Sequence, residues 1–465
     1  MTSLNEFKTF SIHFIGIGGI GMSGLAQILC QKGFAVSGSD IAVNGNIERL
    51  QAMGVSIVIG QKPENVEGKD VIVISTDIKE TNLELQEARA RHLKIFHRAD
   101  VLAMIMADQK PIAISGTHGK TTTTGLMGWV LEVAGLDPTV IDGGIMNNWG
   151  SNVKEGKGEW CVAEADESDG SFTKLPRHIA MITNIDADHM DYYTSIDHLY
   201  GEFETFATDL QNPEGLAVLG IDSPQAYVLW KKIQGSQRCV SYGVHPEADI
   251  RAENIQLSAK GATFDLVKGT SRTSMTLALH GHHNVLNATG IAAISFECGV
   301  SPEALQKAFA SFQGVQRRFT PVGEWNNVTI IDDYAHHPVE IEATIAAARK
   351  ATPGRVLVVL QPHRFSRVDH HFQEFTTSCK DADLTIVLPV YGSREAPREG
   401  ITHEALVAKM PGEVYACDTP EQLPDMLHTL TQPDDMVLCL GAGTISTIAR
   451  ALADQLSALP QRTCA

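Results

Sequence analysis

The stretch "ISGTHGKTTTTG", residues 114–125, decides the fold of the region around it. The apolar residues "PIAIS" that lead into it predict a buried strand, and the residues after it predict a helix. Gly116 and Gly119 allow the intervening backbone to curl, so that its N–H groups converge on a phosphate. Lys120 adds a positive charge, and Thr121 offers a hydroxyl to a phosphate-bound Mg²⁺. The stretch therefore predicts a nucleotide phosphate site.

The spacing of this turn departs from the general phosphate-loop pattern, whose first glycine would fall at Ile114. Its leading glycine is instead Gly116, which argues against a general ATPase. The alternative interpretation is a Gly-Lys-Thr sequence on a surface turn that binds nothing. We expect the ATP phosphates to contact Gly116, Thr117, His118, Gly119, Lys120, Thr121 and Thr122.

A second glycine-rich turn lies about a hundred residues earlier, in "FIGIGGIGMSG" at residues 14–24. Gly16, Gly18 and Gly21 follow a predicted strand, and Asp40 stands at the end of the next strand, as in dinucleotide-binding folds. The motif alone is weak, because any tight strand-to-helix turn also favours glycine. A dehydrogenase needs only this turn and an ATPase only the later one. Both together suggest an ATP-driven reaction on a substrate that itself carries a nucleotide.

Acidic residues and a histidine follow two further predicted strands. "EADESD" supplies Glu164, Asp166, Glu167 and Asp169, and "TNIDADHMD" supplies Asn184, Asp186, Asp188, His189 and Asp191. We expect the two strands to be parallel and to end side by side near Lys120, where Thr121, Glu164 and His189 could hold Mg²⁺. The alternative is a pair of solvated acidic loops.

The remaining candidate residues fall later in the chain. Asn284 and Asn287, three apart at a helix start, could pair with the adenine edge or could simply cap the helix. "DDYAHHP" and "QPHRFSR" each follow a strand, at the edge where open α/β sheets bind ligands. Arg364 and Arg367 would clamp a carboxylate or phosphate. An amine could be held by Asp332, Asp333, His336 and His337, although a structural role suits any one histidine better.

Composition limits the class of protein. The 465 residues suggest two to four domains, and a net charge of −18 disfavours nucleic acid and anionic membranes as partners. The eight cysteines form no Cys-x-x-Cys pair, and no leader or membrane-length apolar stretch is evident, so we expect a cytoplasmic protein. Strands and helices alternate, with more β character over Gly215–Leu279, which fits three α/β domains divided near Asp108 and Val315.

Taken together, these motifs resemble the Mur ligase family of peptidoglycan synthesis. The resemblance runs from "HFIGIGGIGMSGLA" through "GTHGKTTTT", "EADESD", "TNIDADHMD", "HHNVLNA", "QRRF", "DDYAHHP" and "QPHRFSR" to "LGAGTI". It implies a Rossmann-like N-terminal domain at 1–107 that binds the UDP substrate. It also implies a central P-loop ATPase α/β domain at 108–314 and a Rossmann-like, amino-acid-binding C-terminal domain at 315–465.

The resemblance also implies the reaction and the residues that perform it. The member that this chain resembles most joins L-alanine to UDP-N-acetylmuramate with ATP and Mg²⁺, through an acyl phosphate, as a monomer or homodimer. The UDP substrate would contact Gly16, Gly18, Gly19, Gly21, Asp40 and Ser75. The catalytic residues would be Lys120, His189, Arg318, His336, Arg364 and Arg367. The metal ligands would be Thr121, Glu164 and His189, and adenine would lie against Asn284 and Asn287.

Three alternatives remain open. A murein-recycling ligase would add a tripeptide to the same UDP-sugar. "GIGGIG" lacks the Gly-x-Cys-Gly of that relative, but Ala335 matches its pattern. The effect of Asp142, where asparagine is expected, is open. A nucleotide-gated binding module without chemistry and an NAD-linked oxidoreductase are the other two classes.

Overall fold

The computed structural model of the protein describes residues 4–190, 192–393 and 395–459. Its fold consists of three sheets, each covered by helices. Asp191, one of the predicted acidic residues, lies outside the described residues. Contacts cluster in two compact units. The first comprises Met1–Glu253, Asp265–Met275 and Leu286–Phe312, and the second comprises Asn254–Phe264, Thr276–Val285 and Gln313–Ala465.

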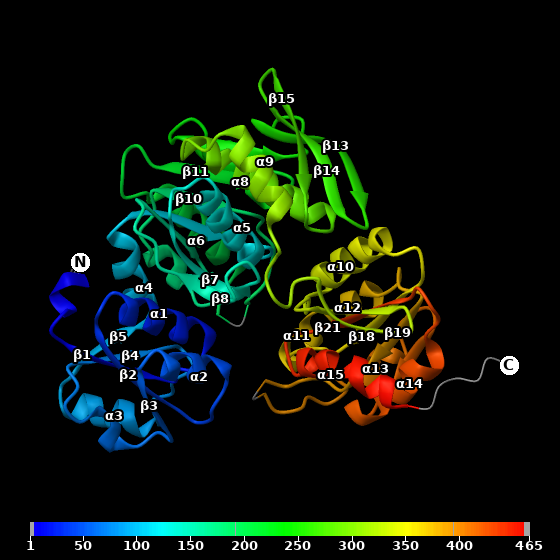
Figure 1. Ribbon diagram of the computed structural model, residues 1–465, viewed down its shortest axis with the longest axis horizontal. Helices are drawn as coiled ribbons and strands as arrows, with labels where there is room; N and C mark the ends of the chain where they lie inside the picture. The colour runs from blue at the N-terminus through cyan, green and yellow to red at the C-terminus, as the bar shows by residue number, and fades with distance from the viewer. Residues whose placement is uncertain (1–3, 191, 394, 460–465) are drawn as a thin grey trace. The chain divides into compact units, whose positions relative to one another are not determined.

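The N-terminal sheet has five parallel strands in the order β3-β2-β1-β4-β5. Its strands are β1 (Ser11–Ile15), β2 (Ala35–Asp40), β3 (Ser56–Ile59), β4 (Val71–Ile74) and β5 (Lys94–His97). Its helices are α1 (Ile20–Gln31), α2 (Gly45–Ala52), α3 (Leu83–Ala90) and α4 (Arg98–Ala107). In Figure 1 the helix α3 lies on the opposite side of this sheet from α1 and α4. The strand order reverses between β1 and β4, the place where doubly wound sheets bind ligands.

The central sheet has ten strands in the order β15-β14-β13-β12-β11-β10-β6-β9-β7-β8. Its first five strands along the chain are β6 (Lys110–Ser115), β7 (Thr139–Met146), β8 (Ser151–Lys154), β9 (Trp160–Glu164) and β10 (Ile179–Ile182). The other five are β11 (Leu216–Gly220), β12 (Cys239–Gly243), β13 (Ile250–Ser258), β14 (Gly261–Lys268) and β15 (Ser271–Leu277). Its helices are α5 (Lys120–Val133), α6 (Ile196–Thr208), α7 (Pro224–Ile233), α8 (His282–Glu297) and α9 (Pro302–Ser311).

One expectation about this sheet is confirmed and one needs correction. The stretch Gly215–Leu279 has the expected β character, with five strands and one helix, α7, which begins at Pro224. The strands before the two acidic motifs, β9 and β10, are both parallel to β6 but are not adjacent to each other. Instead they flank β6 on its two sides. The strand that carries the phosphate turn therefore lies between them.

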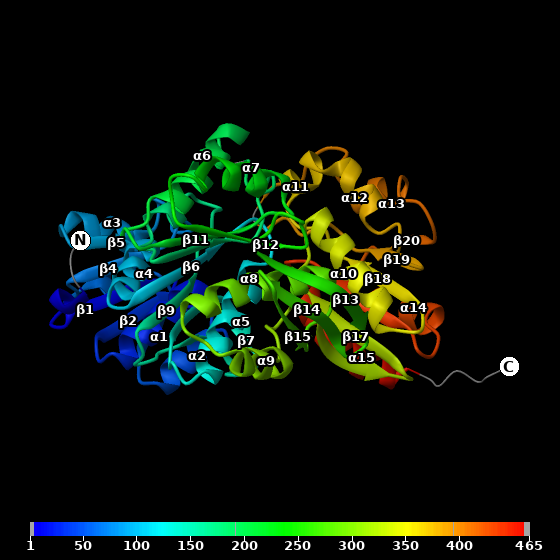
Figure 2. The same ribbon diagram turned by 90° about the horizontal axis from the view of Figure 1, so that it is seen from above.

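The C-terminal sheet has six strands in the order β16-β17-β21-β18-β19-β20. Its strands are β16 (Thr320–Trp325), β17 (Val328–Asp333), β18 (Val356–Leu360), β19 (Leu384–Val387), β20 (Val414–Ala416) and β21 (Met436–Leu440). Its helices are α10 (Pro338–Ala351), α11 (Phe365–His370), α12 (Phe372–Ser378), α13 (His403–Val407), α14 (Leu423–Leu430) and α15 (Ile445–Ala458). The core divides into two layers, with α10 and α12 on one face of the strands and α14 and α15 on the other (Figure 2).

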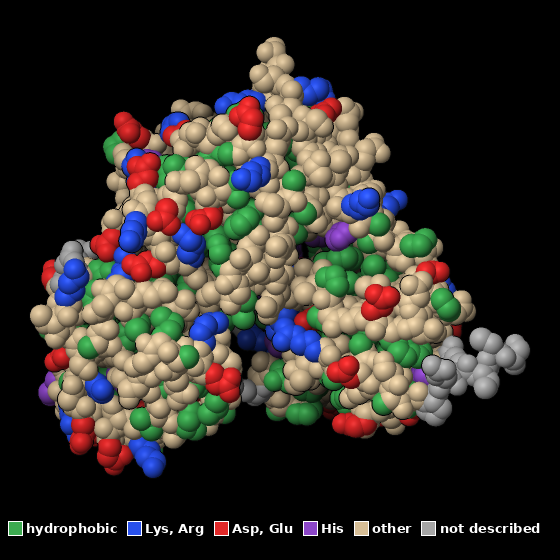
Figure 3. Space-filling view, in the orientation of Figure 1, with side chains coloured by type: hydrophobic (Ala, Val, Ile, Leu, Met, Phe, Trp, Pro, Cys, Tyr) green, Lys and Arg blue, Asp and Glu red, His purple; other side chains and the backbone are tan. Residues whose placement is uncertain are grey.

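These sheets confirm the predicted three-part α/β architecture. The strands read as continuous apolar runs because helices cover both of their faces, and all of β10, β18 and β21 is buried. Among the described residues, no helix is long and apolar enough to span a membrane. Acidic and basic side chains stand in small mixed groups over the face drawn in Figure 3.

We expect Gly38→Ala to destabilise the N-terminal sheet. A Cβ at Gly38, in β2, would lie 2.5 Å from Cδ1 of Ile17 and 2.9 Å from the carbonyl oxygen of Phe14. Such overpacking costs about 1–3 kcal/mol, which urea unfolding would measure. Gly45, at the start of α2, has nothing within 4 Å of the same position, so Gly45→Ala is the matched control. Equal stabilities of the two variants would contradict this account.

Candidate active site

The phosphate turn connects β6 to α5 and accepts only glycine at two positions. Gly116 has φ +131°, and a Cβ there would lie 2.0 Å from Oγ1 of Thr183. Gly119 is the N-cap of α5 and has φ +83°. Side chains rarely adopt either backbone conformation, so these glycines are what allows the chain to turn sharply at the edge of the sheet.

The loop after β10 fixes the shape of this turn. Asn184 accepts a hydrogen bond from the backbone N–H of His118 at 2.9 Å and donates one to the carbonyl of the same residue at 2.9 Å. The backbone N–H of Asp186 donates to the hydroxyl of Thr117 at 2.9 Å. The asparagine predicted as part of an acidic motif therefore acts as a clamp, and the turn is pre-organised by the neighbouring loop.

Lys120 forms a buried ion pair with Glu167. Its Nζ lies 2.7 Å and 3.0 Å from the two carboxylate oxygens and also donates to the carbonyl of Gly116 at 2.8 Å. The side chain of Glu167 is 1% exposed and that of Lys120 is 12% exposed. Sequence reasoning placed Glu167 in the acidic group but gave it no function.

Charge around this pair keeps the lysine protonated. Burial lowers the pKa of Lys120, but the carboxylates of Glu167, Asp166 and Glu164 more than offset that effect, so the pKa is raised. Burial raises the pKa of Glu167 to about 7 against the attraction of Lys120. The carboxylates around Lys120 therefore carry more negative charge than this one lysine balances. Such a site suits a ligand that arrives with a cation.

His189 lies beside the same carboxylate. Its Nε2 is 3.6 Å from Oε1 of Glu167 and 3.6 Å from Oδ2 of Asp188, and its backbone has φ +57°. This positive φ is uncommon for a residue other than glycine and is held by the loop after β10. The structure therefore brings together Lys120, Glu167 and His189.

The carboxylate of Glu164 contacts a different pair of residues, Gly143 and Asp142. Its Oε2 accepts the backbone N–H of Gly143 at 2.9 Å, and a Cβ on Gly143 would lie 2.6 Å from that oxygen. The carboxyl group of Asp142 is next to it. Burial and then the charge of Glu164 raise the pKa of Asp142 well above its usual value.

The predicted adenine residues both lie in the first turns of α8. The side-chain amide of Asn284 donates to the carbonyl of His280 at 2.8 Å. Asn287 borders the phosphate turn, because a Cβ on Gly119 would lie 3.1 Å from its Oδ1. Both side chains are buried, and Asn287 is the one that faces the turn.

The first glycine turn is held by the end of β2. The carbonyl of Ser39 accepts the N–H groups of Gly16 at 2.8 Å and Ile17 at 3.0 Å. The carboxylate of Asp40 accepts the N–H of Gly18 at 2.8 Å, so this aspartate caps the turn itself. Gly16 has φ +77°, which explains the glycine at that position. Gly19 is the N-cap of α1, and the carbonyl of Ser75 accepts a backbone N–H in the turn after β4.

In the C-terminal part, the ring of Tyr334 is contacted by Arg317, Arg318 and His336. The guanidinium of Arg318 lies 5.1 Å from the Tyr334 ring centroid. The rings of His336 and His363 are 5.9 Å apart, and Arg367 lies 3.4 Å from Nδ1 of His363. Arg364 is the N-cap of α11 and has φ +66°.

His336 is a neutral imidazole with a defined tautomer. Burial lowers the pKa of His336 to about 4 and that of His363 to about 3. Nδ1 of His336 lies 2.9 Å from the carbonyl oxygen of Tyr334, which can only accept, so Nδ1 carries the proton. Nε2 then holds the lone pair and can accept a proton.

The sequence did not predict the contacts of Glu167, Tyr334, His363 and Tyr391. The first three belong to the motifs "EADESD", "DDYAHHP" and "QPHRFSR", and this position in a motif was the one sign in the sequence that they lie near the site. Tyr391 lies outside every motif, and only the fold stacks its ring on His363, with centroids 5.7 Å apart.

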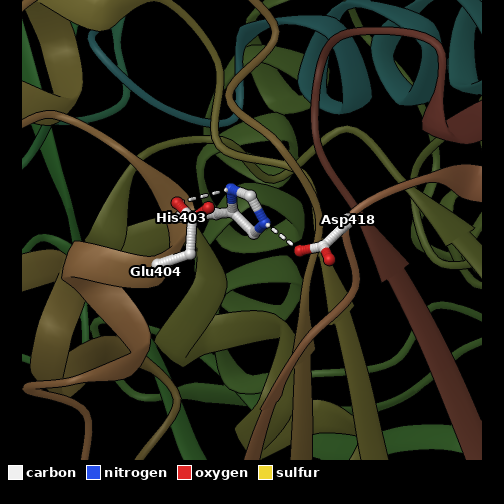
Figure 4. Close-up of side chains that lie close together, drawn as sticks. All are labelled: His403, Glu404 and Asp418. Atoms are coloured by element: carbon white, nitrogen blue, oxygen red, sulfur yellow. Dashed lines mark hydrogen bonds and ion pairs between the residues drawn. The ribbon is translucent and has the colours of Figure 1, made fainter.

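One further histidine cluster, His403, Glu404 and Asp418, lies away from the motifs (Figure 4). Nδ1 of His403 is 3.1 Å from Glu404, and Nε2 is 3.3 Å from Asp418. The two ring nitrogens thus face different carboxylates on either side of the ring. This arrangement is a histidine bridging two acids, and it does not direct three ligands at one metal ion.

Comparisons with known proteins agree with the motifs. Three family models match: Mur ligase family, catalytic domain, at residues 11–110; Mur ligase middle domain at 114–295; and Mur ligase, glutamate ligase domain, at 317–443. The chain is 46% identical to the UDP-N-acetylmuramate–L-alanine ligase of Parvibaculum lavamentivorans over 97% of this chain and 93% of that protein. It is 45% identical to the protein of the same name from Bradyrhizobium sp. strain BTAi1 over 96% and 98%.

Solved structures show the same relation. The crystal structure of UDP-N-acetylmuramate-alanine ligase MurC from Thermotoga maritima matches with a TM-score of 0.82 at 26% identity, over 96% of this chain and 99% of that one. A murein peptide ligase from Psychrobacter arcticus shares the fold, with a TM-score of 0.73 at 22% identity over 97% and 100%. The chain belongs to the Mur ligase family.

We expect Lys120→Ala to lower ATP-dependent turnover at least about 100-fold, because a cation beside the transferring phosphoryl group is lost. It also leaves the carboxylate of Glu167 buried without its partner, which costs about 3–5 kcal/mol of stability. Adding Glu167→Gln should restore stability, measured by urea unfolding, but not turnover, measured by phosphate release. Lys110→Ala, which removes a half-exposed lysine, is the control. Wild-type turnover in Lys120→Ala would refute the assignment.

The contribution of His336 and His363 to stability should fall as the pH drops from about 6.5 toward 4, while the raised pKa values of Asp333 and Glu167 act in the opposite direction over the same window. His336 and His363 have folded pKa values of about 4 and 3, below the ordinary 6.5, so the unfolded chain binds more protons across this window. Protonation therefore favours unfolding as the pH falls through the unfolded value. His336→Asn, which cannot titrate, should remove the share of His336, so that relative to the wild type the variant gains stability as the pH falls from 6.5 to 4. An unchanged slope would contradict a buried neutral His336.

Proposed function

We propose that this chain joins L-alanine to UDP-N-acetylmuramate, converting ATP to ADP and phosphate and giving UDP-N-acetylmuramoyl-L-alanine in peptidoglycan synthesis. The observation that carries the proposal is the presence of two glycine turns within one compact unit, Gly16–Gly21 and Gly116–Gly119. The full-length similarity to ligases with this name supports the same reaction. The first turn would hold the UDP moiety and the second would hold ATP.

The ATP half-reaction would be assembled around Lys120. An oxygen of the muramate carboxylate attacks the γ-phosphorus, the bond to the β–γ bridging oxygen breaks, and ADP leaves. The product is an acyl phosphate, whose phosphate is a far better leaving group than the oxide of a free carboxylate. Lys120 would place its charge on the transferring group as the γ-phosphate replaces part of its contact with Glu167.

A magnesium ion beside the phosphate turn is part of this proposal, and the carboxylates around Lys120 supply the negative charge that a cation needs. Thr121 and Glu164 would hold it through oxygen atoms, which Mg²⁺ prefers, and His189 through a ring nitrogen; Glu164 would then exchange its contact with Gly143 for the ion. When bound, Mg²⁺ would neutralise charge on the phosphate oxygens. Asn287, and Asn284 on the same helix, would contact the adenine.

The second half-reaction needs a free amine. An alanine ammonium group must lose a proton before its nitrogen can attack the acyl carbon and expel phosphate. Neutral His336 would accept that proton at Nε2, and Arg318, Arg364 and Arg367 would hold carboxylate and phosphate oxygens.

We also propose the domain limits 1–107, 108–314 and 315–465. The substrates, ATP and a UDP-sugar, favour a cytoplasmic site of action, and either a monomer or a homodimer would suffice.

Incubation with ATP, Mg²⁺ and UDP-N-acetylmuramate, followed by each amino acid or the tripeptide in turn, tests the function. We expect phosphate release to depend on L-alanine. Release with the tripeptide alone would identify the recycling reaction instead, and release without any acceptor would exclude a ligase. An ¹⁸O label in the muramate carboxylate should appear in the released phosphate; product formed with unlabelled phosphate would exclude the acyl phosphate.

A further inference from the structure

Arg98 occupies a position to which neither the motifs nor the comparisons give a function. It is the first residue of α4 and directly follows β5. The strands β1, β4 and β5 are parallel neighbours, so the first glycine turn, the turn after β4 and Arg98 all lie at the same edge of the N-terminal sheet. The backbone there is fixed by a capping box in which the N–H of His97 donates to Asp100 at 2.9 Å.

The guanidinium lies against the last glycine of the turn. A Cβ on Gly21 would stand 3.5 Å from Nη1 of Arg98, which is ordinary van der Waals contact. Gly21 belongs to the first turn of α1, where backbone N–H groups have no partner within the helix. A positive side chain and a helix N-terminus therefore face the same small region.

Two carboxylates lie near the guanidinium of Arg98 but accept no hydrogen bond from it. Its Nη2 is 3.9 Å from Oδ2 of Asp169 and 4.0 Å from Oδ2 of Asp166, both beyond hydrogen-bond distance. Asp169 is already held by the hydroxyl of Thr76 at 3.0 Å and the N–H of Ser171 at 3.0 Å. Within the described part of the chain, the guanidinium of Arg98 makes no hydrogen bond, and the side chain is 27% exposed.

We infer that Arg98 binds the pyrophosphate of the UDP-sugar, an inference that rests on the proposed function. A guanidinium offers two parallel N–H donors that match two phosphate oxygens, and a phosphate would form the short hydrogen bonds that the two aspartates do not. Asp166 and Asp169 hold the side chain near the turn by charge alone. The muramate carboxylate is the other anionic group of this substrate, but the contact with Gly21 favours the pyrophosphate.

Arg98→Gln tests the inference, with UDP itself as the probe. Calorimetric titration should show both UDP and UDP-N-acetylmuramate binding about 10- to 100-fold more weakly than to the wild type, as expected for loss of a charged hydrogen bond. ATP affinity and the thermal unfolding midpoint should stay unchanged, and Arg98→Lys should recover part of the loss. Arg89→Gln, which removes an exposed arginine of α3 paired with Glu80, is the matched control and should change nothing.

Other results would overturn the inference. Unchanged UDP binding in Arg98→Gln, whether or not the UDP-sugar binds more weakly, excludes the pyrophosphate contact. If Asp169→Asn weakens UDP as much as Arg98→Gln does, then Arg98 acts through its ion pairs and not as a ligand-binding group. Failure of the proposed function is seen separately, in wild-type protein that binds no UDP or releases no phosphate with L-alanine, and the inference then fails with it.

Discussion

The ion pair between Lys120 and Glu167 is the constraint on which the central site depends. A carboxylate that is 1% exposed is stable in its charged form only with a cation against it, and the phosphate turn delivers that cation at a fixed place. Because Lys120 also donates to the carbonyl of Gly116, the pair ties the β9 loop to the turn after β6. His189 reaches the same carboxylate from the loop after β10. One buried charge thus organises the ends of three neighbouring strands.

Much of this fold could be predicted from the sequence. Apolar runs such as "VLVVL" and "IAMI" identified buried strands, and the glycines of both turns marked sharp strand-to-helix connections that the backbone requires. The sequence also marks the start of α10, because Pro338 and the capping Glu340 both favour a helix beginning there. These predictions succeeded because each depends on local periodicity and backbone geometry.

Other features depend on strand order, which local patterns do not encode. The two acidic motifs were expected on adjacent strands, but β6 lies between β9 and β10. For this reason the sequence did not show that Glu167, and not Glu164, pairs with Lys120, or that Asn184 clamps the turn. The stacking of Tyr391 on His363 is likewise invisible in sequence. The assignments of substrate and metal ligands remain predictions, because the position of a ligand depends on its own atoms as well as on the side chains around it.

The crowding at Gly116 has a consequence for inhibition. Its backbone has φ +131°, and Thr183 fills the space that any side chain would need. A compound that gains its affinity from the backbone amides of this turn would bind atoms that no point mutation can remove. Resistance would then have to arise elsewhere, through altered side chains at the rim of the site, because replacing Gly116 would disable the enzyme itself.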